Sequence, residues 1–274
     1  MDDLVDGSSD DPEHDAQFWI TQCSKTLDAK LSNSPDPMDN QEFTDPETKK
    51  KFNDLRSSLD LLPLSRLSAQ PLYDLLKGFE MDLNFDAESS KFPIATETDL
   101  DLYASRVAST IAALVLELVF YHYQNESAFS AAQVKKLTQA GVEMGKALQC
   151  VNIARDIGRD AAIQRVYIPT TWLTEVGLTP SEVIRDPISP KLYIMQEKML
   201  HYAGSLYSKS RAAMELLPID VRGPIRTTVE SYMEIGRELR RRKESILLEE
   251  KFRLPLWRRL LVAWQSMRNG PTVR

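Results

Sequence analysis

Four polar side chains at helical spacing make residues 145–169, GKALQCVNIARDIGRDAAIQRVYIP, the strongest chemical signal in the sequence. On an α-helix that turns about 100° per residue, Gln149, Asn152, Asp156 and Asp160 fall on one face about 80° wide. Two carboxylates one turn apart repel each other, and aspartate does not favour a helix interior. The pattern therefore predicts a divalent cation beside both carboxylates, and Mg²⁺ or Mn²⁺ suits such hard oxygen ligands.

Two arginines, Arg155 and Arg165, flank this face and could bind phosphate oxygens through paired N–H groups. The two amide side chains could hydrogen-bond metal-bound water or the substrate itself. Gly141 and Gly145 continue the same stripe toward the N-terminus, so we expect room there for a bulky apolar group. The simpler alternative is a solvated, charged helix face, which is what most charge runs are. The amides and glycines on the stripe favour a binding site.

A second acidic cluster occupies the beginning of the chain, where Asp2 and Asp6 are one helical turn apart and Asp3 lies beside them. Two such clusters on facing helices would hold metal ions on both sides of a diphosphate. The alternative is a frayed acidic terminus, because disorder concentrates at chain ends. By itself this cluster favours that alternative.

The elements that must position these residues are helices. Alternating strand patterns are nearly absent, and long segments carry helical periodicity. Thr96 is the expected N-cap of one long helix, with Asp99 completing a capping box. With 42% hydrophobic residues, the chain of 274 residues is expected to form an all-α, single-domain bundle. The helices are predicted over residues 15–31, 47–60, 69–82, 97–124, 130–163, 190–216, 222–249 and 254–267, with a short element over 170–186.

Charge and cysteine content exclude several classes of protein. The net charge of −6 argues against nucleic acid as a partner. Two cysteines do not make a disulfide framework, and no signal peptide is visible, so an intracellular protein is expected. The apolar run 111–123 is too short for a membrane span and is predicted to be a buried helix, which leaves only peripheral membrane contact. The basic, amphipathic segment 254–267 could lie on a membrane, but packing against the bundle is favoured.

Beyond these patterns, the sequence resembles the squalene/phytoene synthase family. QCVNIARDIGRDAAIQRVYIP resembles the family's second Asp-rich motif, and DDLVD resembles its first. The segments LYDLLKGFEMDL, DLYASRVAST, ESYMEIGRELRRRKES and LPLWRRLLVAWQSM also match in order, so the resemblance covers nearly the whole chain. It is closest to fungal phytoene synthases.

The resemblance implies a role for each matched residue. Tyr103 would handle a proton or stabilise a cation, together with the catalytic carboxylates of the second motif. The substrate diphosphate would be bound by Gln149, Asn152, Arg155 and Arg165, and Mg²⁺ or Mn²⁺ by Asp2, Asp3, Asp6, Asp156 and Asp160.

The sequence also departs from the family in several places. Ser109 replaces a usual glycine, and Arg159 replaces an acidic residue. Family members have helices before the first motif, whereas this chain begins at it. The domain over residues 1–274 is therefore expected to lack the first helices.

The implied fold is an isoprenoid-synthase bundle around a central cavity. The implied reaction is head-to-head condensation of two geranylgeranyl diphosphates to phytoene through a cyclopropyl diphosphate, with no NADPH. Alternatives are squalene-type condensation of farnesyl diphosphate, and a non-catalytic relative or inactive fragment. Fungal phytoene synthases are often fused to a lycopene cyclase, which would then be a partner. We expect the protein in the cytoplasm or peripherally on an internal membrane.

Overall fold

The computed structural model describes residues 12–35, 45–123, 129–242 and 252–268. All regular elements in these ranges are helical, and one isolated bridge joins Asp86 and Lys91. The all-α prediction is thus confirmed. The chain divides into two compact units, Met1–Leu83 and Asn84–Arg274, and each is described by itself. That residues 1–274 form one domain stays a prediction.

The first unit contains three α-helices, α2 (Pro12–Ser32), α3 (Pro46–Asp60) and α4 (Ala69–Asp82), with a short turn η1 (Leu64–Arg66) between the last two. Its core joins α2 and α4 through apolar contacts, with Leu55 of α3 packed against them. Cys23 lies in this core, and burial raises the pKa of its thiol to about 11. Burial likewise raises the pKa of Cys150, in the second unit, to about 12. Burial and a raised pKa make both thiols poor nucleophiles.

The second unit begins with one continuous helix over 97–122. It consists of α5 (Glu97–Ala104), a π-helical turn η2 (Ser105–Ser109) and α6 (Thr110–His122). The predicted capping box is present: the Thr96 amide donates to Asp99 at 2.8 Å, and the Asp99 amide donates to the Thr96 hydroxyl at 3.3 Å. The π turn was not predicted. Such turns widen a helix locally and are frequent at functional sites.

This helix is less buried than its apolar sequence led us to expect. Among the described residues it is the one helix long and apolar enough to cross a membrane, a property that core helices of soluble proteins share. Leu116 and Val119 are buried in a core cluster with Leu137. Ile111 and Val115 remain 46% and 43% exposed, because they line the open pocket described below.

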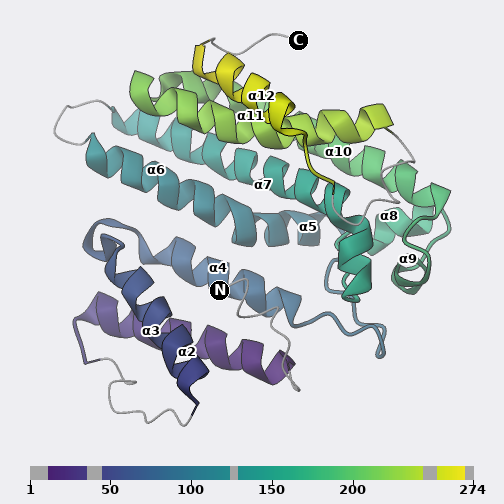
Figure 1. Ribbon diagram of the computed structural model, residues 1–274, viewed down its shortest axis with the longest axis horizontal. Coiled ribbons are helices and arrows are strands. Elements are labelled where there is room, and N and C mark those ends of the chain that lie inside the picture. Colours follow the sequence, from purple (N-terminus) through teal and green to yellow (C-terminus); the bar gives the residue numbers. More distant parts are fainter. Residues whose placement is uncertain (1–11, 36–44, 124–128, 243–251, 269–274) are drawn as a thin grey trace. The chain divides into compact units, whose positions relative to one another are not determined.

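Helix α7 (Ala131–Ala162) is the centre of the second unit. It contacts the 97–122 helix, α10 (Pro190–Ser210) and α11 (Ile219–Arg242), and Figure 1 shows it running between them. Its predicted start is confirmed by a capping box between Ser130 and Gln133. A buried hydrogen bond from Gln196 Nε2 to the Ala154 carbonyl, 2.8 Å long, fixes α10 against it.

The remaining elements complete this unit. Two short helices, α8 (Thr170–Glu175) and α9 (Pro180–Arg185), fill the expected 170–186 element. The predicted 190–216 helix is α10 followed by the 3₁₀ turn η4 (Arg211–Leu216). Helix α11 begins three residues earlier than expected, directly after Pro218. Helix α12 (Leu256–Arg268) lies along α11 (Figure 1).

Candidate functional site

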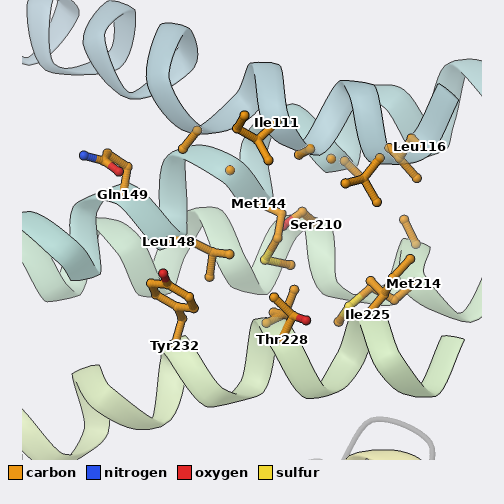
Figure 2. Close-up of a pocket in the computed structure, with 18 of the residues that line it drawn as sticks. Ile111, Leu116, Met144, Leu148, Gln149, Ser210, Met214, Ile225, Thr228 and Tyr232 are labelled. Carbon is orange, nitrogen blue, oxygen red and sulfur yellow. The ribbon is translucent and has the colours of Figure 1, made fainter. Parts of the chain in front are cut away.

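An apolar pocket of about 470 Å³ opens between the 97–122 helix, α7, the α10–η4 junction and α11. Most of its wall is aliphatic or thioether side chains. Figure 2 shows Met144 and Leu148 of α7 facing the pocket from one side, with Thr228 and Tyr232 of α11 opposite. Such a lining suits a long hydrocarbon chain.

The amide side chains of the lining lie at one end of this pocket, whereas the hydroxyls of Ser210 and Thr228 line its middle. Gln149 and Tyr232 lie at one end in Figure 2, whereas Leu116, Met214 and Ile225 lie at the other. Asn152 also lines the pocket and follows Gln149 by three residues on α7, hence on the same helix face. The pocket is therefore amphipathic along its length, with an amide-lined head and an apolar body.

Asn152 carries the clearest sign of a missing partner. Its Oδ1 atom is buried and accepts no hydrogen bond within the described part of the chain. Leaving a buried acceptor unsatisfied costs about 1–3 kcal/mol, so proteins rarely retain one without a reason. An oxygen in this state, in the wall of a pocket, is suited to bind a cation or a donor group of a ligand.

The two carboxylates of the predicted cation site follow Asn152 on the same face of α7. Asp156 is partly buried and accepts from Arg155 through both oxygens, at 2.8 Å from Nε and 2.5 Å from Nη2. Arg159 approaches the same carboxylate at 3.8 Å. The hydrogen bond to Asp156 raises the pKa of Arg155 above its ordinary value against the effect of burial, and Asp160 and Tyr232 add to the rise. Arg155 therefore interacts electrostatically with both carboxylates and with Tyr232 at the pocket.

The end of α7 places Asp160 next to Arg165. The Asp160 carbonyl accepts the Arg165 amide at 2.8 Å, and Gln164 takes the left-handed conformation (φ 60°) that reverses the chain. Both Asp160 and Arg165 are partly buried. The structure thus brings the head of the pocket, the two carboxylates and two arginines onto one stretch of α7 and its cap.

Tyr103 lies apart from the pocket lining. It is 5% exposed and stacks on Tyr167, with ring centroids 4.8 Å apart and planes 25° apart. Tyr167 in turn meets Phe85 edge-on at 5.0 Å. This aromatic cluster ties the start of the 97–122 helix to the chain that follows α7. A direct role for Tyr103 in proton handling stays a prediction.

The structure describes only one of the two acidic clusters of the predicted metal site. Asp2, Asp3 and Asp6 lie outside the described residues, so their convergence with the second cluster stays a prediction. Within the described ranges no group of three or more His, Cys, Asp or Glu side chains could hold a metal ion. Asp156 and Asp160 lie one turn apart on the face of α7 that also carries Asn152, and carboxylate and amide oxygens are of the type that Mg²⁺ binds. A cation shared by the two carboxylates stays a prediction.

The two glycines of α7 correct one sequence interpretation, because protein atoms already occupy the space beside them. A Cβ at Gly145 would lie 2.6 Å from Ser109 Cα and 2.9 Å from the Ala108 carbonyl carbon. A Cβ at Gly141 would meet Leu116 Cδ1 at 2.5 Å. Although both glycines border the pocket, they mainly allow close approach of the 97–122 helix.

Sequence reasoning missed the contribution of α11 to the pocket. Ile225, Thr228, Val229 and Tyr232 line it at spacings of three and four residues, which places them on one face of that helix. The spacing was readable in the sequence. That this face meets the Asn152 face of α7 depends on tertiary packing, which no local pattern reports.

Comparison with known proteins agrees with this architecture. A dehydrosqualene synthase in complex with ligand superposes on 97% of this chain and 80% of its own, with a TM-score of 0.68 and 21% identity. A squalene synthase from Alicyclobacillus acidocaldarius superposes on 88% of the chain and 78% of its own, with a TM-score of 0.59 and 18% identity. The fold is that of the all-helical prenyltransferase-type synthases.

The sequence comparisons identify the family. The model of the squalene/phytoene synthase family matches residues 1–258, and the chain belongs to that family. A bifunctional lycopene cyclase/phytoene synthase of Arthroderma gypseum is 45% identical over 97% of this chain and 44% of its own length. The Aspergillus oryzae protein of the same name is 42% identical over 97% of the chain and 45% of its own length. The chain thus spans less than half the length of these relatives.

Proposed function

We propose that this chain is a phytoene synthase domain that joins two molecules of geranylgeranyl diphosphate head to head, through a cyclopropyl diphosphate, in carotenoid biosynthesis. The observation that carries the proposal is the amphipathic pocket, whose lining residue Asn152 is followed one helical turn later, on the same face of α7, by Asp156 and then Asp160. The names of the relatives support the choice of substrate and product, because several are called phytoene synthases.

The residues of α7 supply the binding of the diphosphate head. Asn152, Asp156 and Asp160 would hold Mg²⁺ or Mn²⁺, which when bound neutralises the diphosphate and favours its departure. Arg155 and Arg165 would bind phosphate oxygens, which guanidinium groups contact in pairs. To bind phosphate, Arg155 would have to exchange its partner Asp156 for the substrate. Until then, the Arg155–Asp156 pair keeps both side chains oriented.

The apolar body of the pocket supplies the environment for the carbocations that follow. With the substrate chain filling the pocket, aliphatic walls and the thioethers of Met144 and Met214 would keep away the water that quenches an allylic cation. Tyr232 stands at the boundary between the polar head and this body (Figure 2). Its ring and hydroxyl dipole are suited to stabilise positive charge near the reacting carbons.

A lycopene cyclase is the proposed partner activity. The relatives carry both activities in their names, and the chain corresponds to less than half of their length. A cyclase acts on a carotene that a separate desaturation step makes from phytoene, so the two activities would serve one biosynthetic route.

The proposal is tested by product analysis. The chain, with Mg²⁺ and labelled geranylgeranyl diphosphate, is expected to form a C40 hydrocarbon without NADPH, and chelation of the metal should stop the reaction. Asp156→Asn should lower the rate at least a hundredfold. Glu143→Gln is the matched control, because Glu143 is a carboxylate of the same helix that contacts Lys146 instead.

Two outcomes would contradict the assignment. A C30 product from farnesyl diphosphate, formed in preference to phytoene, would make the squalene-type alternative correct. Turnover that survives chelation, or that Asp156→Asn and Glu143→Gln reduce equally, would refute the role of the carboxylate face.

A further inference from the structure

Helix α12 has a broad apolar face that the described residues leave uncovered. Leu256 and Leu261 are exposed on it. Trp257, Leu260 and Trp264 are 61%, 60% and 55% exposed. On a helix these five side chains fall within an arc of about 140°, so they form one continuous face. A contiguous surface of large apolar side chains, two of them tryptophans, marks an interaction site in a soluble unit.

The opposite face of α12 is fixed to α11, so the uncovered face does not result from a frayed helix. Val262 and Ser266 are buried, and Phe252 and Leu254 just before the helix are buried as well. Arg226 Nη1 donates to the Ser266 carbonyl at 3.3 Å. The packing that the sequence favoured is therefore present, but it uses only half of the helix.

An ion pair adds to this attachment. Arg258 Nη2 lies 2.6 Å from the Glu234 carboxylate of α11. At the other end of α12, Met267 lies against Gly223, where an added Cβ would meet its sulfur at 2.8 Å. Both ends of the helix are thus held, and the outward direction of the apolar face is set by the fold.

The charges beside this face are all positive. The segment from Phe252 to Arg268 contains four arginines and no acidic residue, although the whole chain has a net charge of −6. Arg253, Arg259 and Arg268 are exposed, and the Arg268 guanidinium lies 4.9 Å from the Trp264 ring centroid. This local excess complements a negatively charged surface.

We propose that the apolar face of α12 docks on an anionic lipid surface, with the helix lying parallel to the membrane. Trp257 and Trp264 would enter the headgroup region, where tryptophan is enriched, and the exposed arginines would contact lipid phosphates. A second copy of this chain fits less well, because a symmetric contact would bring the two sets of arginines together. The proposal is independent of the catalytic assignment.

The tryptophans make this docking directly measurable. The chain has four, and the two outside α12, Trp19 and Trp172, are each only 5% exposed. Addition of phosphatidylcholine vesicles containing phosphatidylserine should therefore shift tryptophan emission to shorter wavelength through Trp257 and Trp264 alone. Replacing both with phenylalanine should remove the shift while cosedimentation with the vesicles persists.

Placing negative charges on the apolar face of α12 tests the docking itself. Leu260→Glu with Trp264→Glu should reduce cosedimentation with phosphatidylserine vesicles at least tenfold. Ile188→Glu with Ile194→Glu is the matched control, because both side chains are about half exposed but lie outside α12. Circular dichroism should show equal helix content in both variants, which separates loss of docking from loss of folding.

Three results would overturn the proposal. The first is equal binding of wild type and the α12 variant to these vesicles. The second is binding to pure phosphatidylcholine as strong as to anionic vesicles, which would remove the role of the arginines. The third is a dimer of the wild-type chain in analytical ultracentrifugation that Leu260→Glu with Trp264→Glu converts to monomer, which would assign the face to a second copy.

Discussion

At the scale of single residues, the polar face of α7 combines a buried oxygen that has no hydrogen-bond partner within the described ranges with a carboxylate that is paired. Asn152 keeps a buried oxygen without a partner among the described residues, and Asp156 is held by both Arg155 and Arg159. Residues that lower stability in a pocket wall are expected to be retained for binding. Stability and activity should therefore respond in opposite directions at Asn152.

Asn152→Leu tests this opposition. Removing the unsatisfied acceptor should leave the free energy of unfolding unchanged or raise it by up to about 1 kcal/mol. Phytoene formation should nevertheless fall at least tenfold, because a ligand of the diphosphate head is lost. Urea unfolding and product assays on the same sample measure both. A loss of stability with activity intact would show that Asn152 is a structural residue.

Asp156→Asn should affect folding as well as turnover. Asp156 and Arg155 are 13% and 17% exposed in their side chains, so the substitution leaves a largely buried guanidinium without its paired acceptor. We expect a loss of about 1–3 kcal/mol of unfolding free energy. Glu143→Gln, whose carboxylate pairs with Lys146 at 3.6 Å, should lose less than about 0.5 kcal/mol. Equal losses would indicate that Arg155 finds another partner.

At the scale of elements, close approach of α7 to the π turn is what shapes the pocket wall. Gly145→Ala would place a Cβ within 3 Å of the Ser109 and Ala108 backbone, which cannot move without separating the two helices. We expect a loss of about 2–3 kcal/mol. Gly204→Ala is the control, since no atom lies within 4 Å of its added Cβ. That change should stabilise by about 0.5–1 kcal/mol through helix propensity. Thermal or urea unfolding distinguishes the two, and a stabilised Gly145→Ala protein would contradict the close contact.

The helices themselves could be predicted because their signals are local. The capping box at Thr96 predicted one helix start correctly, and the start predicted near residue 130 coincides with a second box that the structure shows at Ser130. The amide–carboxylate face of α7 followed from helical periodicity alone. The π turn and the pairing of Asp156 with Arg155 could not be predicted in this way. A π turn depends on packing against Gly145, and a pair between adjacent residues such as Arg155 and Asp156 is outside the usual i,i+4 pattern.

The pocket lay beyond prediction for a related reason. Its head requires Tyr232 of α11 to meet Gln149 of α7, and these residues are far apart in the sequence. Likewise, the segment of α12 could be recognised as amphipathic, but which half would be covered depends on the Arg258–Glu234 contact. Local patterns thus located the chemical groups, while tertiary packing determined their surroundings.

At the scale of the second unit, Glu234 joins α11 to α12. Burial alone would raise the pKa of its carboxyl, but hydrogen bonds from Arg237, Arg258 and Arg241 together lower it below the ordinary value of 4.5. A carboxyl with a lowered folded-state pKa stabilises the fold at pH values above the unfolded pKa. That contribution is lost as the pH falls through the folded pKa.

Unfolding measured against pH should show this effect. At neutral pH, Glu234→Gln should be less stable than wild type, because three arginines lose a charged acceptor. The difference should shrink as the pH falls below about 4.5, where the carboxyl of the unfolded chain begins to take up a proton, and should be lost as the pH falls through the lower folded-state pKa. A difference that stays constant across the acid range would show that the carboxyl contributes through shape and not through charge.

The central claim is that the polar face of α7 binds the diphosphate of a prenyl substrate with the help of a divalent cation. Calorimetric titration with a non-hydrolysable geranylgeranyl diphosphate analogue, with and without Mg²⁺, tests it most directly. We predict Mg²⁺-dependent binding that Asp156→Asn with Asp160→Asn weakens at least tenfold and Glu143→Gln leaves unchanged. Binding of equal strength without the metal, or in the double variant, would contradict the claim.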